Sequence, residues 1–108
     1  MITSAILTAF TSEVHLKIVS WNVNGIRASY KKGLPEFVNL ESPDIFCVQE
    51  TKAHLEQLDD NIVSMGDMFS YFSSAERKGY SGTATYSVLE PIEVTRGIGV
   101  KKFDSEGR

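Results

Sequence analysis

Two short apolar segments, each followed by polar side chains, constrain the fold of this chain most strongly. Residues 44–49 form a nearly continuous apolar run, which is typical of a strand buried on both faces of a parallel or mixed sheet. Residues 16–23 are rich in β-branched and aromatic side chains and lead into the turn-prone pair Asn24 and Gly25. Between them lies a segment with helical spacing. This order predicts a layered α/β fold.

The rest of the pattern predicts one domain in the order strand, helix, strand, helix and then several strands. Apolar side chains recur at helical spacing over residues 34–40, where Pro35 suits a first helical turn, and again over residues 55–65. Three further strands are expected, at residues 69–73, 83–88 and 92–95. A glycine-rich loop at 77–82 and a polar tail at 97–108 complete the pattern.

Length and charge set limits on the class of protein. The 108 residues suit one domain or part of one, and residues 1–15 are expected to be an extension that precedes a domain part at 16–108. The net charge of −3 does not indicate a protein that coats nucleic acid, but it allows a nuclease whose cations and carboxylates nearly cancel. The single cysteine, Cys47, rules out an internal disulfide and fits a reducing compartment. No apolar run approaches the roughly 20 residues of a membrane span, and no targeting segment is expected.

Three polar residues mark the carboxyl ends of the first two predicted strands. Asn22 and Asn24 follow one strand and Glu50 follows the other. Neighbouring strands of α/β folds deliver such residues side by side into a crevice at the sheet edge. A carboxylate with nearby amide oxygens is the kind of site that magnesium prefers. The alternative is an ordinary turn beside a solvated glutamate.

Positive charge follows the same strand ends. Arg27 and Lys52 lie where phosphate would approach such a crevice, whereas Lys31 and Lys32 fit a solvated pair at a helix entry. The loop 77–82 combines cations, glycines, an aromatic side chain and a hydroxyl, which suits either phosphate contact or a plain hairpin loop. The sequence contains no P-loop, no zinc-ligand spacing and no serine-hydrolase elbow.

Four segments in order resemble those of the exonuclease III and abasic-site endonuclease family. They are residues 17–28, residues 42–52 with the run Gln49, Glu50, Thr51 and Lys52, residues 78–82, and residues 97–99 with 104–108. The resemblance extends from residue 16 to residue 108. Residues 99–104 depart from it, because relatives usually carry an acidic run there.

The resemblance implies a four-layer α/β sandwich of the DNase I type, of which this chain holds the amino-terminal part. It implies hydrolysis of phosphodiesters that depends on Mg²⁺ or Mn²⁺, by incision on the 5′ side of abasic sites, by 3′ to 5′ exonuclease action, or both. The expected partner is double-stranded DNA with abasic sites or 3′ ends. A monomer inside the cell, in the nucleus of a eukaryote, is also implied.

The resemblance also assigns roles to residues. Asn22 and Glu50 are expected to be catalytic, Asn24 and Glu50 to hold the metal, and Arg27, Lys52, Gly79 and Tyr80 to contact DNA.

Members of this family are more than twice as long, and their remaining catalytic residues come after the segments matched here. We therefore expect this chain alone to be a truncated fragment with little or no activity. Two alternatives stay open: a phosphatase of the same superfamily, and a non-catalytic fragment that binds DNA or a partner chain.

Overall fold

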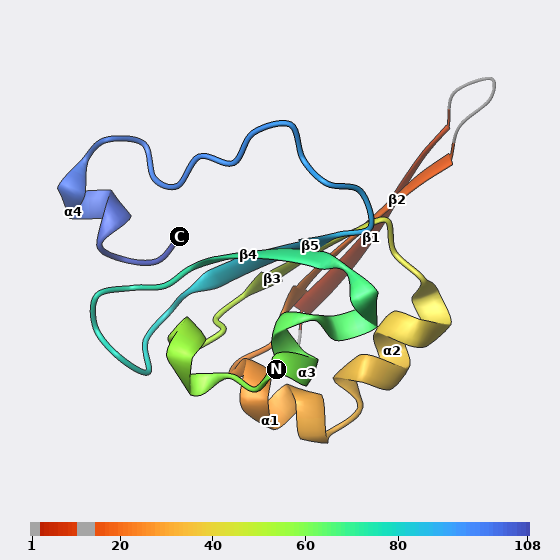
Figure 1. The fold of residues 1–108 in the computed structure, drawn as a ribbon, viewed down its shortest axis with the longest axis horizontal. Coiled ribbons are helices and arrows are strands. Elements are labelled where there is room, and N and C mark those ends of the chain that lie inside the picture. The colour runs from red at the N-terminus through yellow and green to blue at the C-terminus, as the bar shows by residue number, and fades with distance from the viewer. Residues whose placement is uncertain (1–2, 11–14) are drawn as a thin grey trace.

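In the computed structural model, a mixed sheet forms the centre of the fold, with helices on one face and the carboxyl-terminal segment on the other (Figure 1). The structure describes residues 3–10 and 15–108. Over these residues the strand order is β1-β2-β3-β5-β4. The elements in chain order are β1 Thr3–Phe10, β2 His15–Asn22, α1 Ile26–Lys31, α2 Leu34–Glu41, β3 Ile45–Gln49, the 3₁₀ turn η1 Leu55–Gln57, α3 Asp60–Val63, the 3₁₀ turn η2 Met65–Asp67, β4 Phe69–Ser73, β5 Thr83–Ser87 and α4 Lys101–Asp104.

Strands β2 and β3 run parallel, and the other pairings in the described sheet are antiparallel. A parallel pair needs a crossover connection, which α1 and α2 supply here. In this register Asn22 lies opposite Gln49, so both strands end at the same edge. The α/β class and the mixed sheet expected from the sequence are confirmed.

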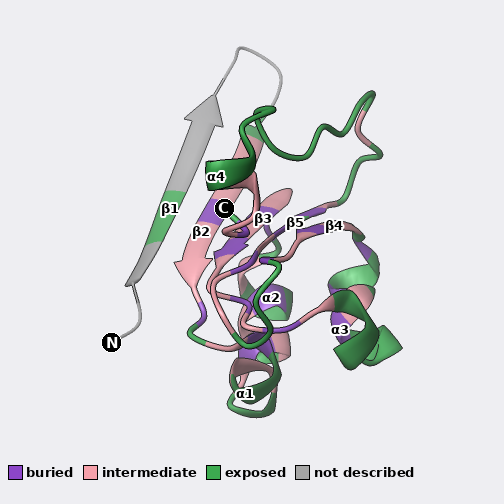
Figure 2. Cartoon of the chain, turned by 90° about the vertical axis from the view of Figure 1, so that its left-hand side faces the viewer, coloured by how far each residue is buried: buried purple, intermediate pink, exposed green. Residues whose placement is uncertain are grey.

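The core lies between the sheet and the helices, as the buried residues in Figure 2 show. Phe46 of β3 and Tyr86 of β5 are fully buried, with ring centroids 6.1 Å apart. The Phe37 ring of α2 lies 6.2 Å from that of Phe46. Buried side chains from both layers complete this core: Val19, Val23, Ile26, Leu34, Val38, Val48, Ala53, Ile62, Met65, Met68, Phe72 and Ala84.

The expected strand at residues 92–95 is wrong. This stretch crosses over the sheet face instead of lying along an edge, so it forms no strand ladder (Figure 1). Arg96 fixes the crossing, because its Nε donates a 2.8 Å hydrogen bond to the backbone oxygen of Phe72 in β4. Ile92 is fully exposed, and the short helix α4 follows.

The single helix expected over residues 55–65 is also wrong, because the segment is divided into η1, α3 and η2. Leu58 is extended, with φ −106° and ψ 137°, and Asp59 then caps a new helix by accepting a 3.2 Å hydrogen bond from Ile62 N. The helix at 34–40 and the strands at 16–23, 44–49, 69–73 and 83–88 are confirmed to within a residue or two at their ends.

Residues 1–15, expected to be an extension, include β1 over residues 3–10. This strand pairs with β2 from Thr3 opposite Asn22 to Phe10 opposite His15. The domain boundary between residues 15 and 16 stays a prediction. None of the described helices is long and apolar enough to cross a membrane.

Candidate metal and phosphate site

The loops that follow β2 and β3 lie side by side because the two strands are parallel and end together. Backbone hydrogen bonds continue this pairing past the strand ends. The N–H groups of Val23, Gly25 and Ile26 donate to the carbonyl oxygens of Gln49, Glu50 and Thr51 at 3.0, 2.8 and 2.9 Å. The loop after β2, which carries Asn24, is therefore hydrogen-bonded to the loop after β3, which carries Glu50.

Four predicted site residues form one hydrogen-bonded cluster at this edge. The side-chain amide of Asn22 donates to Glu50 Oε2, and Asn22 Oδ1 accepts a 3.0 Å bond from the backbone N–H of Asn24. Lys52 Nζ donates to Asn24 Oδ1 at 2.5 Å and lies 3.6 Å from Glu50 Oε1. We call these residues the strand-end cluster: Asn22, Asn24, Glu50 and Lys52.

Glu50 carries the negative charge of the strand-end cluster. The hydrogen bond from Asn22 holds the pKa of the Glu50 carboxyl below its usual range, and the positive charges of Lys52 and Arg108 act in the same direction. The side chain of Glu50 keeps 42% of its surface exposed. An ionised, accessible carboxylate is the minimum that a divalent cation requires.

The backbone around the cluster is strained. Asn24, Glu50 and Lys52 adopt left-handed φ values of 47°, 53° and 52°. Such conformations are uncommon for residues other than glycine and concentrate at functional sites. The hydrogen bonds between the two loops hold this strained backbone in place without any ligand.

A third segment, the loop 77–82, packs beside the cluster. Lys52 N donates to Ser81 O at 2.8 Å, and Thr51 N donates to Gly82 O at 3.0 Å. Tyr80 is therefore brought to the neighbourhood of the strand-end cluster by its own loop. Gly79 is exposed, with φ +72° and no heavy atom within 4 Å of the place where a Cβ would stand.

The carboxyl-terminal residues hold this loop from the other side. Tyr80 OH donates to Glu106 Oε1 at 3.3 Å and accepts from Arg108 Nη2 at 3.2 Å. Arg77 lies over the Tyr80 ring, 5.5 Å from its centroid. The arrangement leaves three positively charged side chains, those of Lys52, Arg77 and Arg108, close to the predicted site segments.

Arg27 is the predicted site residue that the structure does not bring into the cluster. It is exposed in the first turn of α1 and, among the described residues, makes no hydrogen bond with the other predicted site residues. Sequence reasoning missed the contributions of Thr51 and Arg108. Both belong to segments quoted for the family resemblance, but only their placement beside Glu50 reveals a role.

The strand-end cluster offers a metal ion one carboxylate, that of Glu50. In residues 3–10 and 15–108 no group of three or more His, Cys, Asp and Glu side chains is placed to hold a metal ion. Glu50 and the amide oxygens of Asn22 and Asn24 match the donor set of Mg²⁺, which takes one or two carboxylates and keeps several waters. Each amide oxygen already accepts one hydrogen bond and retains a second lone pair.

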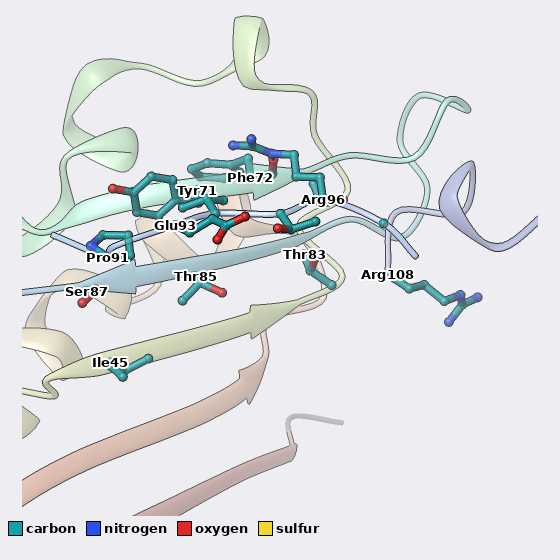
Figure 3. Close-up of a pocket in the computed structure, with 14 residues that line it drawn as sticks. Ile45, Tyr71, Phe72, Thr83, Thr85, Ser87, Pro91, Glu93, Arg96 and Arg108 are labelled. Atoms are coloured by element: carbon teal, nitrogen blue, oxygen red, sulfur yellow. The ribbon is translucent and has the colours of Figure 1, made fainter. Parts of the chain in front are cut away.

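A hollow of about 400 Å³ lies elsewhere, between the open sheet face and residues 91–97 (Figure 3). Its floor is made by side chains of β3, β4 and β5, including Thr83, Thr85 and Tyr71. The residues of the strand-end cluster do not line it. This hollow therefore does not mark the site, which is an exposed edge.

A mixed sheet that carries a carboxylate, two amides and a lysine just past the ends of its parallel strands places the chain among layered α/β proteins. The profile of the Endonuclease/Exonuclease/phosphatase family matches residues 19–107, and the chain belongs to that family. This confirms the resemblance drawn from the sequence.

Relatives within the family are named as an exodeoxyribonuclease and a DNA repair nuclease. The chain is 45% identical over 94 residues to "Exodeoxyribonuclease" of Bacillus subtilis, covering 86% of this chain and 36% of the relative. It is 45% identical over 96 residues to "DNA repair nuclease APEX1" of Danio rerio, covering 87% of this chain and 31% of the relative. The chain thus spans about a third of the length of these relatives.

Solved structures agree on the fold. An AP endonuclease from Archaeoglobus fulgidus superimposes with a TM-score of 0.72 at 31% identity, over 84% of this chain and 34% of that one. A 3′-5′ exonuclease from Neisseria meningitidis gives 0.65 at 29% identity, again over 84% and 34%. The chain therefore carries part of the α/β fold of these nucleases.

Proposed function

We propose that this chain supplies the metal- and phosphate-binding edge of a DNA repair nuclease. The reaction is hydrolysis of phosphodiesters on the 5′ side of abasic sites, removal of nucleotides from 3′ ends, or both. The observation that carries the proposal is the strand-end cluster, which gathers Asn22, Asn24, Glu50 and Lys52 in a chain of this family. The named activities of the relatives support it.

Glu50 is the proposed metal ligand, with the Asn24 amide oxygen beside it. Asn22 keeps the Glu50 carboxylate ionised and oriented through its side-chain amide. The proposed cofactor is Mg²⁺ or Mn²⁺, which when bound stabilises negative charge on the phosphate and leaving oxygens. Lys52 neutralises part of the Glu50 charge until phosphate and metal arrive.

DNA is the proposed partner, bound as a duplex with abasic sites or 3′ ends. Lys52 lies beside Glu50, and Tyr80 and Gly79 lie on the adjoining loop, so these residues are placed to meet phosphates near the metal. Arg27, exposed on α1, is proposed to contact the backbone farther from the cluster. A protein of net charge −3 must bind DNA through such local cations, and its affinity should fall steeply with salt.

The chain alone is proposed to have little or no nuclease activity. One carboxylate holds a metal weakly, and among the described residues no group of three or more His, Cys, Asp and Glu side chains is placed to hold a metal ion. We propose residues 16–108 as the amino-terminal part of the catalytic domain of a monomeric enzyme. As a DNA repair enzyme it would act inside the cell, and in the nucleus of a eukaryote.

The test combines metal binding with cleavage of an abasic-site duplex. Mn²⁺ titration of the chain by calorimetry is compared with Glu50→Gln and with the matched control Glu90→Gln, an exposed glutamate away from the cluster. We expect binding that is lost only in Glu50→Gln. Cleavage is measured beside the full-length Bacillus relative, which should cut while this chain does not.

Three results would contradict the proposal. Unchanged Mn²⁺ binding in Glu50→Gln would remove Glu50 as the ligand. Metal-dependent cutting by the chain itself would show that the residues described here suffice, and cutting of a small phosphoester but not of DNA would indicate a phosphatase.

A further inference from the structure

Thr51 occupies an unusual position between two site residues. Its side chain is 1% exposed, and it is the buried polar residue of the core among the described residues. Its Oγ1 has no hydrogen-bond partner among those residues. A buried hydroxyl is normally paired, because leaving it unpaired costs its lost hydration. The free energy that keeps the side chain there must therefore come from its packing.

The side chain of Thr51 packs directly against Gly82. A Cβ built on Gly82 would lie 2.3 Å from Thr51 Oγ1 and 3.6 Å from Thr51 Cβ. Gly82 also has φ +89°, a conformation that side chains disfavour. The two residues approach as closely as they do because one of them has no side chain.

This contact stands at the centre of a stack of three segments. Thr51 N donates to Gly82 O at 3.0 Å, and Gly82 N donates to Gly107 O at 3.0 Å. Gly107 itself fits closely against Ala75, because a Cβ there would meet the Ala75 backbone nitrogen at 2.4 Å. The loop that carries Glu50 and the loop that carries Tyr80 are thereby kept at one fixed separation.

The residues on either side of Thr51 are Glu50 and Lys52, the two charged members of the strand-end cluster. Glu50 and Lys52 have left-handed φ values of 53° and 52°, so neither would hold its conformation without outside support. The backbone oxygen of Thr51 also accepts a 2.9 Å bond from Ile26 N, which ties it to the loop after β2. Thr51 therefore joins its own loop to both the loop after β2 and the loop 77–82.

We propose that Thr51 is a positioning residue that holds Glu50 and Lys52 in the strand-end cluster through the fit of its side chain against Gly82. The shape of the Thr51 side chain carries this role, and its hydroxyl makes no hydrogen bond in it. The proposal rests on the proposed function for what Glu50 binds. Its geometric part stands on the contacts alone.

The test is a cycle of variants in the full 108-residue chain. Gly82→Ala introduces the collision with Thr51, and Thr51→Ala/Gly82→Ala removes it, since the remaining neighbours of the new Cβ, Thr51 Cβ at 3.6 Å and Lys52 N at 3.8 Å, are at ordinary contact distances. Gly99→Ala is the matched control, because Gly99 has φ +85° but no heavy atom within 4 Å of the place where its Cβ would stand. It shares the backbone strain without the collision.

Two NMR signals report on positioning. The Asn22 side-chain amide resonance senses its bond to Glu50, and hydrogen exchange of the Lys52 N–H senses its bond to Ser81. We expect Gly82→Ala to shift the Asn22 resonance and to speed Lys52 exchange about tenfold or more. The double variant should recover much of both signals, and Gly99→Ala should leave both unchanged. A double variant no better than Gly82→Ala alone would overturn the proposal.

A second pair of variants decides the matter if Gly82→Ala does not fold. Thr51→Val keeps the shape and removes the hydroxyl, whereas Thr51→Ala removes the shape. We expect the two signals to be preserved in Thr51→Val and lost in Thr51→Ala. Equal disturbance by both variants would refute a role for shape.

Mn²⁺ separates this proposal from the proposed function. In the unmodified chain, bound Mn²⁺ should broaden the Asn22 side-chain resonance selectively. If no broadening occurs, metal binding by the cluster is wrong, while the exchange rates still decide whether Thr51 positions Glu50.

Discussion

Asn22 and Glu50 lie 28 positions apart in sequence, yet the side-chain amide of Asn22 donates a hydrogen bond to Glu50 Oε2. The bond joins the ends of the two parallel strands and is the main reason that the pKa of Glu50 is lowered. It orients a partly exposed carboxylate and extends its ionised form to lower pH. The orientation of the proposed metal ligand and the low pKa of its carboxyl thus depend in large part on one amide.

Asn22→Ala should raise the pKa of Glu50 toward the usual glutamate value of about 4.3. In the unmodified chain the lowered pKa favours the folded state above the unfolded-state pKa, and this contribution is lost as pH falls through the folded-state pKa. The variant should lose that acid dependence. Carboxyl ¹³C NMR titration measures the change, with Asn61→Ala, an exposed helical asparagine, as the control. Identical Glu50 titrations in all three proteins would contradict the assignment.

Lys52→Met should separate metal binding from DNA binding. The Lys52 ammonium group donates a hydrogen bond to Asn24 Oδ1 and lies 3.6 Å from Glu50 Oε1. Its removal should tighten Mn²⁺ binding, because it competes with the metal for these oxygens. Loss of one phosphate contact should weaken DNA binding and lower the slope of log K against log salt by about 1.

Because the ion pair of Lys52 and Glu50 is exposed, Lys52→Met should change the free energy of unfolding little. Calorimetry and salt-dependent binding measure the two affinities of Lys52→Met, with Lys31→Met on the exposed face of α1 as the control. If metal and DNA affinities fall together, Lys52 supports the cluster rather than competing for its oxygens.

Tyr86→Phe should destabilise the fold at neutral pH and make it less sensitive to alkali. Tyr86 OH donates a 2.6 Å hydrogen bond to Ile62 O, and its loss should cost about 1–2 kcal/mol. Burial raises the pKa of Tyr86, so the folded state keeps the phenol protonated where the unfolded state ionises.

The unmodified chain should therefore lose stability as pH rises above about 10, the usual tyrosine pKa, and Tyr86→Phe should lose less. Urea denaturation at neutral and alkaline pH gives both numbers. Tyr71→Phe, at a partly buried position on β4, is the comparison. Parallel stability curves for Tyr86→Phe and the unmodified chain would exclude this source of alkaline sensitivity.

Phe46→Ala should nearly unfold the chain. The ring is fully buried between those of Phe37 and Tyr86, and its removal from such a position typically costs about 3–5 kcal/mol. Phe69→Ala, at a site 44% exposed, should cost far less. Thermal melts of both variants test the expected order, and a larger effect at Phe69 would place the core on the wrong face of the sheet.

Much of this fold could be predicted from the sequence because local patterns and burial agree. The apolar run at 44–49 and the alternation at 83–87 match strands whose inward side chains, such as Phe46 and Tyr86, are buried. Residues 92–95 have the composition of a strand but lie across the sheet face. Composition does not show whether a pairing partner is available.

Part of the candidate site could likewise be predicted from the sequence, and part could not. The strand ends placed Asn22, Asn24, Glu50 and Lys52 near one another, and the structure brings them into hydrogen-bonding contact. Nothing in the sequence indicates the fit between Thr51 and Gly82, because that contact depends on the separation of two loops from distant parts of the chain. The distance between these two loops is set only when the whole sheet has formed.

The parallel register of β2 and β3 couples the core to the candidate site. Side chains alternate along a strand, so a slip of β2 by one residue would turn Val19 outward and send the outward-facing Asn22 toward the helices. A chain that misplaced its strand-end cluster in this way would first fail to bury its interior. A chain with this error in the site therefore fails to fold. Random substitution should seldom yield a stable protein in which only the strand-end cluster is displaced.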